Sequence, residues 1–428
     1  MFKKQQVGYD KTIDRKRSFA KTMVTGAAFI IVASALMRGT GYPVYEHGIF
    51  MLASILFAVT IMQWEAGRDG GGNRFILIWT GSLAVVAVAS VAWSLEPILS
   101  ISSAFIYIAY ALFSFSCFRI GQIFEGAWSN TVLPMLLTVV FAGTIVALTG
   151  IIGYAATAYP WAMVVDGMLM ASSSLEYPNG LAVYVLMTLA PTLYVWGLAT
   201  GRSRLLAAIA AAIQFAAIGL SFSKTGIVFL VLLAVYLVAR SRTQGYRKKR
   251  YLYAGLCLIV LFLLPYAATL AGGYDFAGWA TRDVTFDSIV SHRFATWEGS
   301  IDAWLDRPWM GWGAGVFDTV FPGYALDSAP RHAHNIFLHA AVEFGLIGLV
   351  SFIILYVYGF RLIHRSFFTS RNEGDNDLRR ALSFSCLVFL TVNLWDFTFY
   401  IPAITILFIV LFAMLGGGET RPATPPTS

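Results

Sequence analysis

Cysteine and charged residues are scarce in this chain. Only three of its 428 residues are cysteine, and 12% are charged. Cys117, Cys257 and Cys386 lie far apart, in or beside apolar stretches, which argues against a disulfide framework and against a cysteine-based metal site. The nucleotide-binding pattern G-x-x-x-x-G-K-S/T is also absent from the sequence, which argues against ATP-driven transport by this chain alone.

Hydrophobic residues, by contrast, make up 58% of the chain and form repeated stretches long enough to cross the hydrocarbon core of a bilayer, which is about 30 Å thick. The sequence therefore predicts an all-α polytopic membrane protein with about twelve transmembrane helices, because a helix satisfies its own backbone hydrogen bonds in lipid. The predicted spans cover residues 19–37, 48–64, 75–93, 98–118, 131–153, 180–198, 205–220, 224–239, 251–270, 335–360, 381–395 and 400–416.

Lysine and arginine are unevenly distributed among the connections between these spans. With a cytoplasmic amino terminus, 24 of the 30 basic residues lie on the cytoplasmic side, as the positive-inside rule requires. We therefore expect both termini in the cytoplasm. Most of the net charge of +7 lies in the amino-terminal arm and in residues 240–250, which predicts contact with anionic membrane lipids and no nucleic-acid partner.

The predicted spans divide the chain into three parts. Residues 1–270 contain transmembrane helices 1–9 and the basic cytoplasmic arm, and residues 334–428 contain helices 10–12 and a cytoplasmic tail. Between them, residues 271–333 form a long loop on the outer side of the membrane. Long ordered loops often carry function, so we expect functional residues in or beside this loop.

An amphipathic helix is predicted inside the loop, where apolar residues recur at alternating spacings of four and three. The stripe consists of Val290, Phe294, Trp297, Ile301 and Trp304. We expect this helix to lie on the membrane face. Arg293 lies at the edge of the stripe, from which its guanidinium could reach a lipid phosphate, although ordinary snorkelling to headgroups is the alternative.

A glycine-rich turn with two tryptophans follows this helix at residues 307–315. Tryptophan rings stack on sugar faces and also anchor proteins at membrane interfaces. Trp312 is therefore a candidate sugar-stacking residue, and a simple packed turn is the equally plausible interpretation.

Three histidines lie close together in the sequence, at His332, His334 and His339. Their spacing does not match a metal-binding motif, and His339 is better explained as the buried structural partner of Glu343, four residues later. His334 is expected at the amino terminus of a helix, where the helix dipole disfavours an imidazolium and suits the ring to act as a general base. A structural histidine is the alternative interpretation.

Basic residues on the outer side form a second group of candidates. Arg293, Arg331 and Lys224 could together bind a phosphate or pyrophosphate and stabilise the charge of a leaving group. Lys224 lies in a short connection at membrane depth, where we expect it to have an anionic partner; reaching the headgroup layer is the alternative.

The segment from His334 carries a resemblance to a known family. His334-Asn335, nine further residues, Gly345, two residues and Gly348 match the pattern H-(N/S/Q)-x9-G-x-x-G of bacterial O-antigen ligases. Helical periodicity also predicts that Gly345 and Gly348 lie on the same face of one continuous helix as His334. The Ser223-Lys224-Thr225-Gly226 turn and Pro178-Asn179 resemble other pieces of that family.

This resemblance implies transfer of a glycan from undecaprenyl pyrophosphate to a sugar hydroxyl of lipid A core, on the periplasmic side of the bacterial inner membrane, with no metal or other cofactor. His334 would activate the acceptor hydroxyl and Arg293 would stabilise the pyrophosphate. The residues expected to bind substrate are Lys224, Arg331, Asn335, Trp312 and Asn179.

One departure from the family pattern leaves a second enzyme class open. Many of these ligases have arginine where this chain has Lys224, which offers a single-point rather than a bidentate phosphate contact. A polymerase of O-antigen or exopolysaccharide, with a second glycan as acceptor, is therefore the alternative. A lipid-linked sugar transporter fits less well, because the polar residues gather at one surface and no repeated halves are evident.

Overall fold

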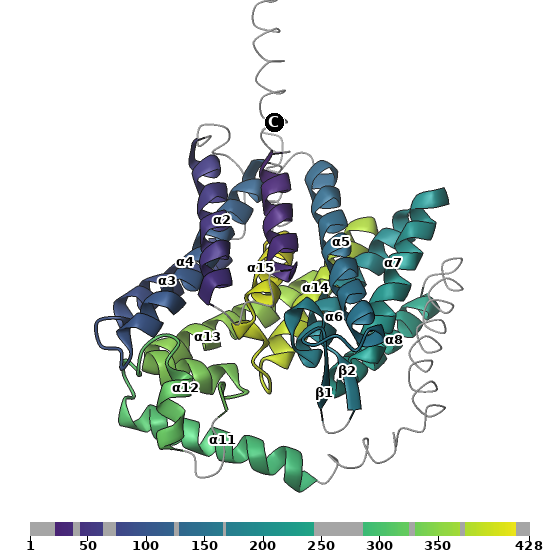
Figure 1. Cartoon of the computed structure of the whole chain (residues 1–428). Coiled ribbons are helices and arrows are strands. Elements are labelled where there is room, and N and C mark those ends of the chain that lie inside the picture. The colour runs from purple at the N-terminus through teal and green to yellow at the C-terminus, as the bar shows by residue number, and fades with distance from the viewer. Residues whose placement is uncertain are drawn as a thin grey trace, which may run out of the picture.

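The computed structural model describes residues 22–36, 43–62, 74–123, 128–165, 168–243, 286–324, 330–368 and 373–416. These residues form a mostly helical bundle (Figure 1). An apolar helix covers Thr22–Leu36. The labelled helices are α2 (Pro43–Met62), α3 (Arg74–Ser90), α4 (Pro97–Ile123), α5 (Trp128–Ala155), α6 (Pro178–Leu198), α7 (Gly201–Leu220), α8 (Lys224–Thr243), α11 (Phe286–Asp306), α12 (Phe317–Val320), α13 (Ile336–Phe368), α14 (Glu373–Val392) and α15 (Pro402–Gly416).

Membrane-spanning capacity is clear for part of this bundle. Among the described residues, five helices are long and apolar enough to cross a bilayer by length and composition, and five more apolar helices are shorter. The chain is therefore a membrane protein. Eleven predicted spans overlap described helices, whereas the span predicted at 251–270 lies outside the described residues. The count of twelve stays a prediction.

Helices α6 and α15 form the centre of the bundle. From Leu181 to Leu189 nearly every side chain of α6 is fully buried, and so is almost every side chain of α15 up to Phe412. Helix α6 packs against α5, α7 and α14, and α15 packs against α4 and α14. At Gly143 of α5, an added Cβ would lie 2.0 Å from the Thr188 hydroxyl of α6, so the close approach of these two helices requires glycine.

Two short strands modify the predicted all-α fold. β1 (Ala162–Val165) and β2 (Met168–Ala171) pair in antiparallel register between α5 and α6. A two-stranded hairpin is marginal by itself, but Met168 and Met170 pack on Phe222, at the turn before α8. Sequence periodicity misses this hairpin because each strand has only four residues.

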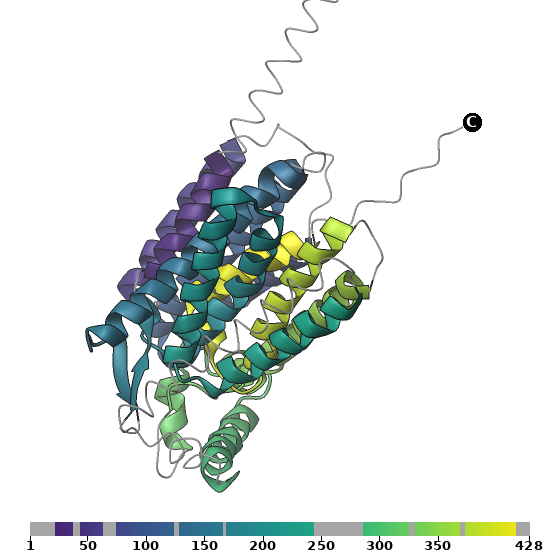
Figure 2. The same cartoon turned by 90° about the vertical axis from the view of Figure 1, so that its right-hand side faces the viewer.

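Helix α11 is present where the amphipathic helix was predicted, and it lies across the lower end of the bundle in both views (Figure 1, Figure 2). Its buried contacts differ from the predicted stripe. From Arg293 onwards, where burial is described, the buried positions are the small residues Thr296, Gly299, Ser300 and Ala303, whereas Phe294 and Ile301 are exposed. Small residues let the α11 backbone approach the protein closely, which leaves larger apolar side chains on its outer surface.

The long helix α13 is broken at Gly345, which has φ of 62° and ψ of −149°. An added Cβ there would lie 2.4 Å from the Trp309 carbonyl carbon, because the 308–313 turn docks against the break. The Leu346 N–H donates to the Pro308 carbonyl, and the Trp312 N–H to the Val342 carbonyl. The expectation of one continuous helix with Gly345 on the His334 face was therefore wrong, because this glycine provides a left-handed backbone position rather than a helical face.

Candidate functional site

Asp396 is the centre of a buried hydrogen-bond cluster between the carboxyl end of α14 and η5 (Thr398–Tyr400). The Tyr177 hydroxyl donates to its carboxylate at 2.9 and 3.1 Å. The Asn179 amide donates at 3.3 Å and the Phe397 N–H at 2.8 Å. A buried carboxylate is expensive unless it is hydrogen-bonded, and this one is surrounded by donors.

The cluster continues into the turn before α8. The Ser223 hydroxyl donates to the Asn179 side-chain carbonyl at 2.8 Å and accepts the Gly226 N–H at 3.1 Å. The Asn179 amide is thereby held with its nitrogen towards Asp396. Pro178-Asn179 and Ser223–Gly226 thus meet in one network, although 44 positions separate Ser223 from Asn179.

His334 lies against this carboxylate. Its Nδ1 is 3.7 Å from the Asp396 Oδ1, and its side chain is 28% exposed whereas that of Asp396 is 1% exposed. The distance is too long for a hydrogen bond, but catalytic hydrogen bonds are often long before substrate binds. His334 is therefore partly open to solvent on one side and faces a buried anion on the other.

The backbone at His334 is held in a left-handed conformation with φ of 51°. Such a position costs about 1–3 kcal/mol in a non-glycine residue and persists only where surrounding contacts impose it. Here the Ile336 N–H donates to the Asn393 carbonyl at 3.0 Å, and the Asn335 amide donates to the Leu394 carbonyl at 3.1 Å. His334 therefore lies at the amino terminus of α13, as predicted, two residues before the first helical residue, Ile336.

Asn335 is the residue that caps α13. Its side-chain oxygen accepts the N–H groups of Phe337 and Leu338 at 2.9 and 3.1 Å. Both ends of the amide are thus engaged by the protein, as is typical of an N-cap. These contacts support a role in holding His334, and the predicted contact of Asn335 with substrate stays untested.

Arg293 acts electrostatically on the same cluster. Burial and the Asp396 charge hold the pKa of Tyr177 well above its usual value, whereas the positive charge of Arg293 lowers it. Arg293 is partly buried on α11. Of the predicted site residues, the structure thus places His334 and Asn179 against Asp396, and Arg293 within electrostatic range of Tyr177.

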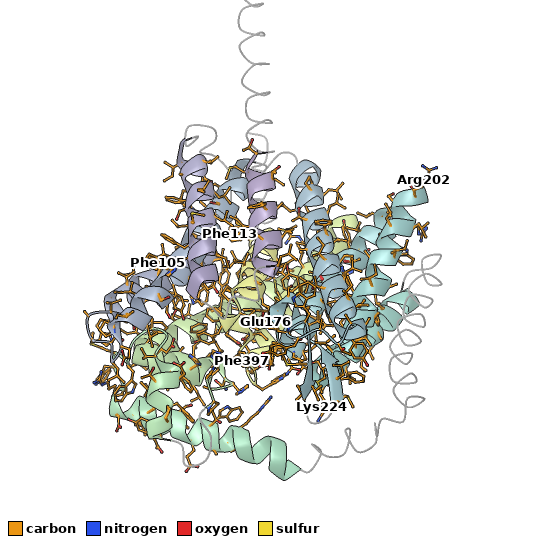
Figure 3. The ribbon with its side chains drawn as sticks, viewed as in Figure 1. Phe105, Phe113, Glu176, Arg202, Lys224 and Phe397 are labelled. Carbon is orange, nitrogen blue, oxygen red and sulfur yellow. The ribbon has the colours of Figure 1, made fainter. Side chains whose placement is uncertain are left out.

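The other predicted binding residues lie around this cluster or apart from it. Lys224, the first residue of α8, and Phe397 lie towards the same end of the bundle, opposite Arg202 (Figure 3). Arg331 is exposed beside His332. Trp312 packs elsewhere: its indole N–H donates to the Ala303 carbonyl at 2.7 Å and the Arg307 guanidinium covers its ring at 4.1 Å. These contacts favour the packed turn over the sugar platform.

The Phe397 ring contacts both His334 and His332. His332 stacks on the Phe397 ring at 4.4 Å, and His334 meets the same ring edge-on at 5.2 Å. Burial, followed by the nearby histidines, lowers the pKa of His332 well below its usual value, so that ring is neutral. The His339 Nε2 lies 3.2 Å from the Glu343 carboxylate, which confirms the predicted buried pair. Within the described residues, no three His, Cys, Asp or Glu side chains gather in a metal-binding arrangement.

Sequence reasoning missed Asp396 and Tyr177. A signal for Asp396 was present, because it is the sole charged residue between positions 381 and 418, where a carboxylate beside predicted spans is expensive and marks function. Tyr177 carried no such signal, since tyrosine is common at membrane interfaces.

Comparison with known proteins adds the family. Residues 182–353 match the model of the O-antigen ligase family, from the second turn of α6 to the middle of α13. No curated protein matches the chain significantly. His334, Asn335, Gly345, Lys224 and Arg293 lie inside the matched region, whereas Asp396 lies beyond it. Over residues 182–353 the chain is therefore similar to the O-antigen ligase family.

Proposed function

We propose that this protein transfers a glycan from a polyprenyl-pyrophosphate donor to a sugar hydroxyl of lipid A core. The observation that supports this proposal most strongly is the His334–Asp396 pair, a partly exposed imidazole backed by a buried carboxylate. Such a pair is the arrangement that activates a hydroxyl for attack. The family match supports a glycosyltransferase-like enzyme that uses lipid-linked glycan, and the undecaprenyl donor and the ligase reaction are our assignment.

In the proposed reaction, Asp396 accepts a hydrogen bond from the His334 Nδ1–H and so leaves Nε2 free to take a proton. The acceptor hydroxyl loses its proton to Nε2 while its oxygen forms a bond to the anomeric carbon of the donor. The bond from that carbon to the pyrophosphate oxygen breaks, and the lipid pyrophosphate leaves with the electron pair. The imidazolium that forms is stabilised by the Asp396 charge.

Cations have the complementary task of stabilising the leaving group. Arg293 lies near enough to influence Tyr177, so its guanidinium is the best-placed group to bind the pyrophosphate beside the cluster. Lys224 and Arg331 are proposed as further phosphate contacts. Asn179 and Asn335 are assigned to positioning, because their amides hold Asp396 and the start of α13.

Two variants test the chemical roles. His334→Ala should abolish glycan transfer, while His364→Ala, near the far end of the same helix, should leave it intact. Arg293→Ala should reduce transfer strongly, with Arg202→Ala at the opposite end of the bundle as its control. Transfer at the normal rate by His334→Ala would remove the catalytic assignment, and full activity of Arg293→Ala would remove the pyrophosphate role.

The acceptor separates a ligase from a polymerase of the same superfamily. Purified protein receives the lipid-linked glycan together with either lipid A core or a second lipid-linked unit. Consumption of lipid A core supports the ligase. Elongation of the second unit alone would replace our proposal with a polymerase, and movement of the lipid across vesicles without a new glycosidic bond would indicate a transporter. We further propose that the reaction takes place at the periplasmic face of the inner membrane, with both termini in the cytoplasm.

A further inference from the structure

A cavity of about 290 Å³ lies beside the His334 cluster, between α4 and the broken helix α13. Its walls come from one face of α4, from the turn and helix start at residues 315–318, and from the segments around residues 331, 343 and 400. The volume is far larger than that of one water, about 30 Å³, and is near the lower end of small-molecule sites, about 300 Å³. The space therefore suits a ligand the size of a small ring.

Buried polar atoms at this cavity lack partners. Within the described part of the chain, the Ser102 hydroxyl and the His332 Nδ1 make no hydrogen bond, although both are shielded from solvent. Buried polar groups are almost always paired, so each exception requires an explanation. Two such groups from different segments at one cavity indicate a polar ligand that completes their hydrogen bonds.

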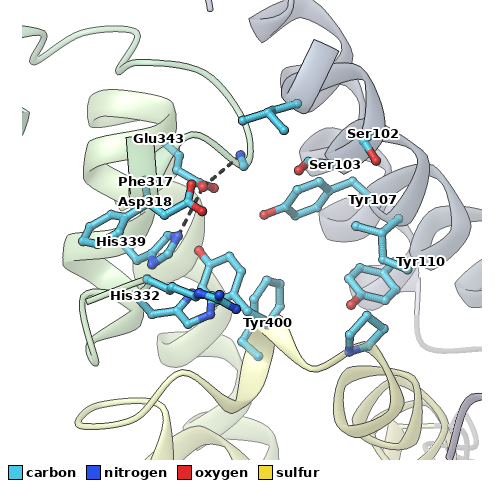
Figure 4. A pocket seen from close by; sticks show the side chains of 16 residues that line it. Ser102, Ser103, Tyr107, Tyr110, Phe317, Asp318, His332, His339, Glu343 and Tyr400 are labelled. Carbon is cyan, nitrogen blue, oxygen red and sulfur yellow. Dashed lines mark hydrogen bonds and ion pairs between the residues drawn. The ribbon is translucent and has the colours of Figure 1, made fainter. Parts of the chain in front are cut away.

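The opposite wall supplies carboxylates. One oxygen of Glu343 accepts the Gly315 N–H at 2.8 Å and lies 3.2 Å from the His339 Nε2. Its other oxygen accepts no hydrogen bond of normal geometry from the residues that the structure describes, although the Phe317 N–H lies close to the carboxyl group. Figure 4 shows the hydroxyls of Ser103 and Tyr107 directed from α4 towards Glu343 and the neighbouring Asp318.

The charged, hydroxyl and aromatic groups that line the cavity indicate which class of ligand it would bind. Among the described lining residues, the Asp318 carboxylate opposes the cation of Arg331, so the cavity lacks the excess of positive charge that a phosphate or pyrophosphate needs. Carboxylate acceptors, hydroxyl groups and the rings of Tyr107 and Tyr400 match a sugar, which offers hydroxyl donors around an apolar C–H face.

His332 connects the cavity to the proposed base. It lines the cavity and stacks on Phe397, the ring that also meets His334. We propose that the cavity between α4 and α13 is a sugar-binding subsite that holds one ring of the donor or acceptor glycan beside His334. The inference rests on the proposed function, since it assigns a subsite to that reaction.

Ser102→Leu tests the subsite by placing bulk in the cavity from α4. Its matched control is Ile101→Phe, which adds bulk one residue away at an exposed position on the same helix. Initial rates are measured with the strain's own lipid-linked repeat unit and its lipid A core, each varied in turn. We expect Ser102→Leu to raise the KM of one substrate at least tenfold with kcat changed less than threefold, and the control to match wild type. The substrate whose KM rises identifies the glycan that occupies the cavity.

A second measurement does not depend on turnover. Saturation-transfer NMR on the full-length protein in detergent detects binding of the free repeat-unit oligosaccharide or of the core oligosaccharide. Ser102→Leu should abolish the signal of one of them, and His334→Ala should retain it. Unchanged KM values together with unchanged signals in Ser102→Leu would overturn the subsite while leaving the proposed function intact. Normal transfer by His334→Ala would instead overturn the catalytic assignment.

Discussion

Replacing Asp396 with asparagine tests whether the buried carboxylate assists His334. The side chain keeps its shape, so its oxygen still accepts from Tyr177 and from the Phe397 N–H. The new NH2 group would face the Asn179 NH2, but an amide flip of Asn179 removes that clash, since the Ser223 hydroxyl can donate or accept. Asp396→Asn should therefore fold, and its effect should be confined to the lost charge.

The size of the effect follows from the distance between the two groups. Opposite charges about 4 Å apart interact by about 4 kcal/mol at an effective dielectric constant of about 20. The His334 Nδ1 and the Asp396 Oδ1 are 3.7 Å apart, but His334 is 28% exposed, so water screens part of this energy. A loss of about 3 kcal/mol of transition-state stabilisation corresponds to a roughly 100-fold lower kcat.

The assay is glycan transfer by purified protein at saturating substrate, with thermal unfolding measured in the same detergent. Asp377→Asn is the matched control, because it removes a carboxylate that pairs with Arg380 at 3.7 Å, at the other end of α14. A kcat within threefold of wild type for a correctly folded Asp396→Asn variant would refute the assisted-base reasoning.

Two further predictions concern the structure around the site. Gly345→Ala should destabilise the protein by at least about 2 kcal/mol, since φ is 62° and the Cβ would meet the Trp309 carbonyl carbon at 2.4 Å. The control is Gly197→Ala in helix α6, where no described atom lies within 4 Å of an added Cβ, so this change should be neutral or should stabilise the protein by up to about 1 kcal/mol. Equal unfolding temperatures in the two variants would contradict this reasoning. Folding lowers the pKa of His332 below its usual 6.5. As the pH falls below 6.5, His332 therefore takes up a proton in the unfolded state before it does so in the folded state. The free energy of unfolding should then fall by up to about 1.4 kcal/mol per pH unit. The His332→Phe variant keeps an aromatic ring for stacking and should lose less stability than wild type between about pH 7.5 and about pH 5.5. An equal decrease in unfolding temperature over this pH range in the variant and in wild type would contradict the prediction.

Local motifs were sufficient to find several members of the site. Three pieces of the site could be found in the sequence, because a motif is recognised from residues that are close together in the chain. They are the pattern from His334 to Gly348, the Ser223–Gly226 turn and Asn179. Motifs did not reveal that Ser223 hydrogen-bonds to Asn179, or that the Asn335 amide donates to the Leu394 carbonyl. Those contacts depend on how separate helices pack.

The break in α13 at Gly345 is a second feature that local sequence patterns did not predict. Helical periodicity placed Gly345 on the His334 face, because it assumes that the helix continues through the glycine. The docking of the 308–313 turn decides otherwise, and that turn is distant in sequence from the residues it contacts. In α11, likewise, the face with small residues packs against the protein because it allows a close approach, so the buried face is selected by shape rather than by hydrophobicity.

The amino-acid sequence alone determined that this chain is a helical membrane protein and that it contains a histidine segment similar to that of O-antigen ligases, because hydrophobic length and short motifs are local properties. Only the tertiary structure decided that Asp396 is the partner of His334, that Tyr177 and Asn179 hold this carboxylate, and that a polar cavity opens beside them. The physical reason is that a buried carboxylate contacts its neighbours through space, and Tyr177 and Asn179 lie 219 and 217 positions from Asp396 in the chain.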